Sequence, residues 1–216
     1  MTIADNIRAI RAELPKWVTL ICVSKNQSEE AIMEAYNAGE RHFGESHVQE
    51  LCKKYEDLPK DIRWHMIGHL QTNKVKDIVP FVHLIQSVDS WKLLETINTE
   101  AGKIGRKVAV LLEVHVAQEQ TKSGMTVDEL QDILPRLGEL EYVEVLGLMT
   151  MATNTDDEQE LRRCFHQLAT LPSPLPSPIS NLHGILSMGM SEDYPIATEE
   201  GSNMIRVGSK IFGDRL

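Results

Sequence analysis

Short apolar runs alternate with amphipathic stretches along most of the chain. The runs predict strands at residues 18–24, 41–43, 62–67, 82–85, 108–116, 143–149, 183–186 and 204–207. Apolar residues at helical spacing predict helices near residues 3–14, 29–38, 44–55, 72–78, 90–103, 127–137, 156–169 and 195–202. Alternation of this kind is typical of parallel strands joined by helices.

About eight strand–helix units predict a closed α/β barrel of the TIM type, (β/α)8, with one extra helix at the N-terminus. An open doubly wound sheet is the alternative. That fold more often carries a G-x-G-x-x-G turn after its first strand, and this chain has none. No composition shift marks a domain boundary, so we expect a single domain over residues 1–216.

Prolines interrupt the pattern at residues 171–180. Because proline fixes φ and lacks an N–H donor, this stretch cannot be a helix or a central strand. It predicts an extended surface connection, and a docking motif for a proline-binding domain is the alternative.

Net charge and composition limit the classes of partner and the cellular location that we expect. The net charge of -10 over 216 residues argues against a nucleic-acid partner, which needs an excess of lysine and arginine. No run approaches the ~18 apolar residues of a membrane span, and the N-terminus lacks the features of a signal peptide. Three widely spaced cysteines without a C-x-x-C pattern favour reduced thiols and a cytoplasmic location.

Lys25 directly follows the first predicted strand, just before a helix that Ser28 would cap. Active sites of α/β barrels lie at the carboxyl ends of the strands. A lysine there can be desolvated, which lowers its pKa and makes its neutral amine available to an aldehyde. The alternative is a lysine that extends into water from a strand end.

Two later stretches have the composition of a phosphate site. Residues 187–191 follow the seventh strand, and residues 206–209 follow the eighth. In barrels these loops often hold a phosphate, which glycine backbone, exposed N–H groups and serine hydroxyls can bind. The alternative is that these are two ordinary glycine-containing loops.

A lysine opposite a phosphate site describes a pyridoxal phosphate site. Arg206 is then the candidate group at the pyridine nitrogen. Arginine stays protonated, so its hydrogen bond would keep that nitrogen unprotonated and weaken the ring as an electron sink. This disfavours transaminase chemistry and suits restrained proton transfer or simple carriage of the cofactor.

Nine short motifs follow one another along the chain. They are Val23-Ser24-Lys25, Phe43-Gly44-Glu45, Val48-Gln49-Glu50, Trp64-His65-Met66-Ile67-Gly68, Leu70-Gln71-Thr72-Asn73-Lys74, Lys122-Ser123-Gly124, Gly147-Leu148-Met149, Ser187-Met188-Gly189-Met190-Ser191 and Arg206-Val207-Gly208-Ser209-Lys210-Ile211-Phe212-Gly213. In this order they resemble the motifs of the pyridoxal phosphate homeostasis protein family, which looks like the N-terminal barrel of alanine racemase standing alone.

The resemblance implies specific roles for five residues. Lys25 is the expected Schiff-base lysine for pyridoxal 5'-phosphate, and Arg206 is expected at its pyridine nitrogen. Ser191, Gly208 and Ser209 are the expected phosphate contacts. The resemblance also implies a role in vitamin B6 and amino-acid homeostasis.

The chain departs from the family pattern at several positions. Ser46 and His47 stand where family members usually have Asn-Tyr, and His115 stands where they usually have asparagine. We carry no side-chain role over to these three residues. Ser209 replaces a usual threonine, and this change keeps both the hydroxyl and the backbone N–H.

An amino-acid racemase or another enzyme of this fold type is the alternative function, and a scaffold with an empty barrel is a third. Racemases need a second base, which comes with a second domain, and this chain ends at Leu216. We therefore expect a monomeric cofactor carrier without efficient catalysis and without catalytic residues. Its expected partners are pyridoxal phosphate and the apoenzymes that depend on it.

The spacing of the histidines along the sequence does not indicate a metal site. His65 and His69 form an H-x-x-x-H pair, but Met66 stands where a metalloprotease needs glutamate, and Gly68 breaks a helical reading. We expect no metal ligands and place His65 near the barrel mouth as a polar residue.

Overall fold

The computed structural model describes residues 1–116, 123–153, 155–171 and 184–213. In these residues parallel strands lie side by side in chain order and close into a barrel, because β1 pairs with β8 as well as with β2. The strands are β1 (Thr19–Val23), β2 (His42–Glu45), β3 (Arg63–Met66), β4 (Leu84–Val88), β5 (Val108–Glu113), β6 (Val143–Met149), β7 (Ile185–Ser187) and β8 (Met204–Val207). This confirms the predicted barrel.

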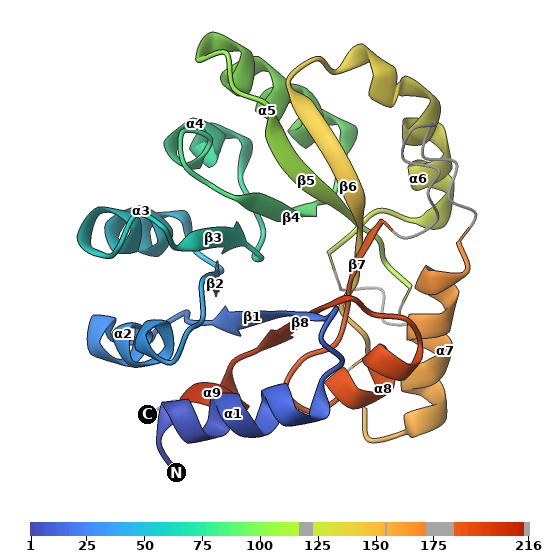
Figure 1. Cartoon of the computed structure of the whole chain (residues 1–216). Coiled ribbons are helices and arrows are strands. Elements are labelled where there is room, and N and C mark those ends of the chain that lie inside the picture. The colour runs from blue at the N-terminus through green and yellow to red at the C-terminus, as the bar shows by residue number, and fades with distance from the viewer. Residues whose placement is uncertain (117–122, 154, 172–183, 214–216) are drawn as a thin grey trace.

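Helices cover the outside of the barrel (Figure 1). They are α1 (Ile3–Glu13), α2 (Glu29–Asn37), α3 (Val48–Asp57), η1 (Thr72–Lys74), α4 (Val75–Ile78), α5 (Trp91–Lys103), α6 (Val127–Ile133), η2 (Leu134–Glu139), α7 (Glu158–Ala169), α8 (Tyr194–Glu199) and α9 (Ser209–Phe212). The extra helix α1 packs against α2 and α9. Asn6 links α1 to α9, since its Nδ2 donates to the carbonyl of Ile211 at 2.9 Å.

Local signals fix where several helices begin. Thr2 and Thr126 form capping boxes at the starts of α1 and α6. Ser28 and Ser90 accept from the N–H three residues later at the starts of α2 and α5. Each cap satisfies a backbone donor that the helix itself cannot reach, so these starts are set by neighbouring residues.

Two apolar layers stabilise the barrel. The larger lies between the strands and the helices and includes Phe43, Trp64 and Phe165. A smaller cluster lies on the opposite strand faces, inside the barrel, and consists of Ile21, Leu84, Leu111, Met149 and Met204. By strand alternation the buried polar residues His65, Gln86, Ser187 and Arg206 share this interior.

Several element bounds differ from the sequence prediction, and burial explains why. Gly44 and Glu45 continue β2 instead of starting the next helix, because Glu45 pairs with Met66 of β3 and is fully buried. Strand β4 runs later than predicted, since the polar residues Gln86 and Ser87 are buried strand residues that interrupt the apolar pattern. The four-residue helix α9 is too short to show a period.

Other differences lie at strand ends. Strand β5 ends at Glu113 and not at Val116, because Val114 leaves the ladder to bridge Met125. Strand β7 begins at Ile185, and His183 lies outside the described residues, as do residues 172–180 of the proline-rich stretch. Among the helices of the described residues, none is long and apolar enough to cross a membrane.

Candidate functional site

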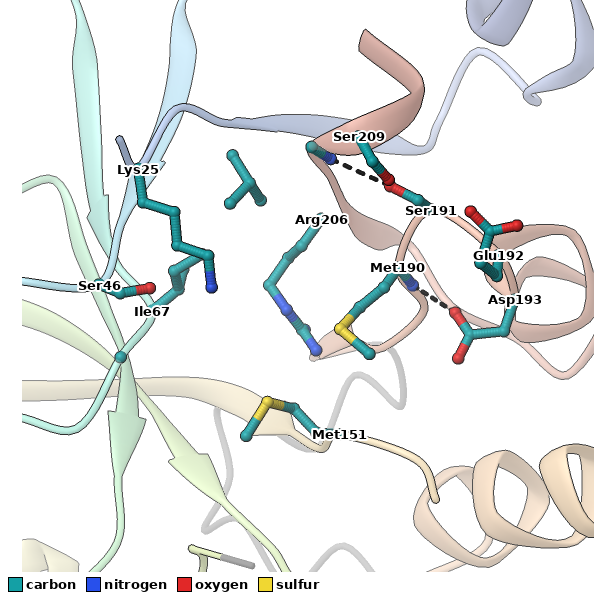
Figure 2. Close-up of a pocket in the computed structure, with 13 residues that line it drawn as sticks. Lys25, Ser46, Ile67, Met151, Met190, Ser191, Glu192, Asp193, Arg206 and Ser209 are labelled. Carbon is teal, nitrogen blue, oxygen red and sulfur yellow. Dashed lines mark hydrogen bonds between the residues drawn. The ribbon is translucent and has the colours of Figure 1, made fainter. Parts of the chain in front are cut away.

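A cavity of about 650 Å³ lies at the carboxyl ends of the strands. Its walls come from the loops after β1, β2, β3, β6, β7 and β8, and they include all five residues that the sequence singled out (Figure 2). The lining residues are Val23, Lys25, Ser46, Ile67, Gly68, Met151, Met190, Ser191, Glu192, Asp193, Arg206, Gly208 and Ser209. The fold therefore brings Lys25 together with residues more than 160 positions later in the chain.

Lys25 lies two residues beyond β1 and is half-buried. Figure 2 shows its side chain extending into the space between Ser46 and Arg206. The next residue, Asn26, has a φ of 61°, and its N–H donates to Glu50 Oε1 at 2.7 Å. This left-handed residue turns the chain sharply after the strand, which leaves Lys25 directed into the cavity.

A buried lysine supports the strand end that carries Lys25. Lys54 Nζ donates to the carbonyl of Ser24 at 2.7 Å and to Glu45 Oε1 at 2.9 Å. Ser24 Oγ donates to the same carboxylate oxygen at 2.6 Å. These bonds tie the ends of β1 and β2 to α3. Burial raises the pKa of Glu45 to about 7 even though Lys54 favours its charged form.

Sequence reasoning missed this support, although a signal was present. Lys54 occupies a position on the apolar stripe of α3, where Val48 and Leu51 are also buried. A lysine at such a position is almost never fully buried unless it is paired. A carboxylate partner nearby in the fold was therefore to be expected.

Arg206 projects from β8 into the barrel and is 4% exposed. Its Nη1 donates to the carbonyl and the Oγ of Ser187 at 2.8 and 2.6 Å, and its Nη2 donates to the carbonyl of Thr150 at 2.7 Å. Burial lowers the pKa of Arg206 to about 10, while Asp193 and Glu113 act in the opposite direction. The guanidinium is therefore charged at neutral pH and held in one orientation.

The hydrogen bonds of Arg206 continue through the barrel interior. Ser187 Oγ donates to Gln86 Oε1 at 2.6 Å, and Gln86 Nε2 lies 2.9 Å from His65 Nδ1. His65 Nε2 lies 2.9 Å from His42 Nδ1. Burial holds the pKa of His65 well below its ordinary value, so this ring is neutral. The polar chain thus runs from the cavity toward the amino ends of the strands, and His65 lies inside the barrel, not at its mouth.

The far wall of the cavity combines hydroxyls with backbone N–H groups. Ser191 Oγ accepts from the N–H of Gly208 at 3.2 Å, which joins the loops after β7 and β8. A Cβ on Gly208 would lie 3.3 Å from the carbonyl oxygen of Val23, so glycine lets this loop approach β1 closely. Ser209 begins α9, and the first N–H groups of a helix have no acceptor within it. This wall can bind an anion.

The residues that depart from the family pattern are placed differently from one another. Ser46 lines the cavity, while exposed His47 lies at a neighbouring cavity of about 380 Å³. His115 is absent from the described lining and donates its backbone N–H to Met125 at 2.8 Å. His69 pairs with Asp89 at 3.2 Å, apart from the His65 contacts.

Comparisons with known proteins agree with this arrangement. The family model for the alanine racemase N-terminal domain matches residues 1–216. The pyridoxal phosphate homeostasis protein of Aquifex aeolicus is 41% identical over 197 residues, which cover 91% of this chain and 86% of the relative. The protein of the same name from Schizosaccharomyces pombe is 37% identical over 203 residues, which cover 92% and 84%.

Solved structures show the same fold. PipY of Synechococcus elongatus with PLP bound is 40% identical and superimposes with a TM-score of 0.88, covering 98% of this chain and 100% of PipY. Alanine racemase of Clostridium difficile has a TM-score of 0.84 at 16% identity, and the match spans 99% of this chain and 57% of the racemase. At that identity the likeness shows the fold alone. The chain therefore belongs to the pyridoxal phosphate homeostasis proteins, within the alanine racemase N-terminal domain family.

Proposed function

We propose that the chain binds pyridoxal 5'-phosphate in this cavity and acts in vitamin B6 and amino-acid homeostasis. Lys25 is the covalent attachment point for the aldehyde, and Arg206 contacts the pyridine nitrogen. Ser191, Gly208 and Ser209 hold the phosphate. The observation that carries the proposal is that one cavity places the lysine and the anion-binding wall around a fixed guanidinium.

The cavity suits this cofactor in size and in donor chemistry. Its volume of about 650 Å³ lies within the range of small-molecule sites. Its polar groups include an amine, a guanidinium, three serine hydroxyls and backbone N–H groups, which match an aldehyde, a ring nitrogen and a phosphate. The carboxylates of Glu192 and Asp193 also line the cavity. When bound, pyridoxal phosphate supplies an electrophilic aldehyde joined to an electron-withdrawing ring.

Arg206 favours carriage over transformation of amino acids. Within the described residues, its hydrogen bonds to Ser187 and Thr150 use three of its five N–H donors. The other two N–H groups can donate to a ligand. A permanent donor at the ring nitrogen keeps a proton away from that atom. The ring then withdraws electrons less strongly, which suits a protein that holds the cofactor.

Borohydride reduction tests the attachment point. We expect the protein to absorb in the near-violet, and reduction to fix one cofactor on Lys25 by intact mass and peptide mapping. Lys25→Ala should abolish the band, while Lys53→Ala, a change at an exposed lysine, should leave it unchanged. A band that survives Lys25→Ala, or a modified peptide elsewhere, would contradict the assignment.

An amino-acid racemase is the alternative function, because the chain shares its fold with alanine racemase. Exchange of the alanine α-proton in deuterated water distinguishes the two. We expect exchange far below ordinary enzyme turnover of ~1 s⁻¹. Exchange at or above that rate would show that the chain is an enzyme.

We also propose that apoenzymes dependent on pyridoxal phosphate receive it from this protein in the cytoplasm. The three widely spaced cysteines without a C-x-x-C pattern support a reducing compartment such as the cytoplasm. An apo-aminotransferase should regain activity from the loaded protein in the presence of a phosphatase that destroys free cofactor. No recovery under that trap would remove direct delivery from the proposal.

A further inference from the structure

Three histidines meet at the amino-terminal end of the barrel, opposite the cofactor cavity. His42 is the first residue of β2, His65 lies within β3, and His83 immediately precedes β4. One ligand nitrogen from each ring lies within 4.8 Å of the others. The H-x-x-x-H spacing of the sequence does not describe this group, because its members come from three separate segments.

The ring spacing is that of imidazoles around one ion. The ring centroids of His42 and His65 lie 5.1 Å apart, those of His42 and His83 5.6 Å, and those of His65 and His83 5.3 Å. Zinc–nitrogen bonds of ~2.1 Å at tetrahedral angles hold three imidazole centroids about 5 Å apart. The centroid spacing therefore suits a shared ion, and the ligand nitrogens, which lie within 4.8 Å of one another, must come to about 3.4 Å to bind it.

The three histidine side chains differ in how deeply they are buried. His65 is fully buried, His42 is half-buried, and His83 is exposed. An ion held by all three would have protein on one side and water on the other, so a water molecule can complete the coordination. Neutral imidazole ligands select transition-metal ions over magnesium or calcium, which prefer oxygen ligands.

The polar chain inside the barrel sets the hydrogen positions on His65. Arg206 donates to Ser187, whose hydroxyl then donates to Gln86 Oε1. The Gln86 amide nitrogen is consequently the donor toward His65 Nδ1, 2.9 Å away. A neutral histidine has one ring hydrogen, so His65 carries it on Nε2.

Hydrogen-bond donors and acceptors do not match at the His42 end of this series of polar side chains. His65 Nε2–H donates to His42 Nδ1, which places the hydrogen of neutral His42 on Nε2. Arg63 Nη1, which is always a donor, lies 3.2 Å from that same Nε2. With the Gln86 amide in this orientation two donors therefore face each other. Turning the amide so that its oxygen accepts from His65 Nδ1 relieves the mismatch and leaves His65 Nε2 with a lone pair.

We propose that His42, His65 and His83 form a binding site for a divalent transition-metal ion of the zinc and cobalt class. The ion takes the lone pairs of His65 Nε2 and His42 Nδ1 in place of the hydrogen between them. Ligation through Nε2 moves the His65 hydrogen to Nδ1, and Gln86 turns its amide oxygen toward it. A ligating histidine commonly donates its second N–H to such an acceptor.

Two arginines oppose a cation here. Arg63 is exposed and can turn into water, which removes its contact with His42. The Arg106 guanidinium stays near the site, because it donates to the carbonyls of Val79 and Val82. A second, independent prediction follows: removal of the Arg63 charge should strengthen binding of the metal ion.

Cobalt titration of the untagged full-length chain tests the site, with visible absorbance as the readout. We expect one Co²⁺ per chain with the intense bands of tetrahedral nitrogen coordination, and displacement by Zn²⁺. His83→Ala should weaken binding about tenfold or more, because it removes one of three ligands. His83 is exposed, so the variant should keep the metal-free melting temperature.

Two further variants complete the test. His166→Ala removes an exposed histidine that pairs with Glu200 on the far helices, and it should leave Co²⁺ binding unchanged. Arg63→Ala should bind Co²⁺ several-fold more tightly than the wild type. Absence of tetrahedral bands, or equal weakening by His83→Ala and His166→Ala, would overturn the proposal.

Discussion

Gly68 stands where the loops after β2 and β3 come closest. A Cβ at this position would lie 2.7 Å from Ser46 Cα and 2.8 Å from Ser46 Cβ, closer than real side chains pack. Both residues line the cavity at the carboxyl ends of the strands. Because glycine has only a hydrogen atom in place of a side chain, the loops after β2 and β3 can approach this closely beside the cavity.

Gly68→Ala should destabilise the fold by about 1–3 kcal/mol, because the backbone of Ser46 must move to admit the methyl group. Cofactor affinity should fall as well. Gly138→Ala is the matched control, since a methyl group there would meet no neighbouring atom of the described residues within 4 Å. Urea unfolding of both variants measures the difference, and equal midpoints would contradict the packing argument.

Glu45 gives the fold a pH dependence of unusual sign. Its pKa is about 7 in the folded chain and near 4.5 when unfolded, because burial disfavours its charge and its Oε2 has no hydrogen-bond partner among the described residues. Between these values the folded state holds a proton that the unfolded state has lost. The resulting stability is complete below pH 4.5 and disappears as the pH rises through 7.

Glu45→Gln removes this titration while keeping the shape of the side chain. The stability of the variant relative to the wild type should therefore increase from about pH 5 to about pH 8. Thermal unfolding across that window measures the gap between the two proteins. A gap that stays constant would show that Glu45 does not titrate there.

At the scale of elements, helix starts are more predictable than strand bounds. The helix predicted near residues 90–103 is α5, and Ser90 caps its start, because a cap involves residues three positions apart. Strand β4 was placed too early, because Gln86 and Ser87 look like loop residues until the barrel buries them. A strand's limits depend on its neighbours, and those neighbours lie in other parts of the chain.

Ser90→Ala should lower the free energy of unfolding by about 1 kcal/mol, because the Leu93 N–H loses its acceptor. Thr96→Ala in the same helix is the control. The Thr96 hydroxyl donates to a helix carbonyl that already has a partner in the ladder, so its loss should be nearly neutral. If urea unfolding gave both variants the same loss of unfolding free energy, the Ser90 cap would not be what stabilises the start of α5.

At the scale of the molecule, the barrel hides most of its large apolar side chains. Those exposed in the described residues are Met1, Trp17, Ile104 and Met190, which lie on separate segments. A stable dimer buries about 800 Å² on each partner around an apolar centre. Scattered side chains do not supply such a centre.

We therefore expect a monomer of 24.4 kDa in solution. Sedimentation equilibrium over a range of concentrations measures this mass directly. Trp17→Ser should leave the mass unchanged, because its 60% exposed ring would not be part of an interface. A mass near twice that of the chain would contradict the expectation.

The sequence by itself determined the alternation of strands and helices, the helix caps and the position of Lys25 just beyond a strand end. These are properties of neighbouring residues, so a local pattern carries them. Arg206 was expected after the eighth strand but lies within β8. Only the tertiary structure decided which polar groups meet inside the barrel. Ser187 and Gln86 bond across 101 residues, and the histidines of the amino-terminal end come from three segments. Such partners are set by barrel closure, because burial forces each polar group to find a partner wherever the chain has brought one.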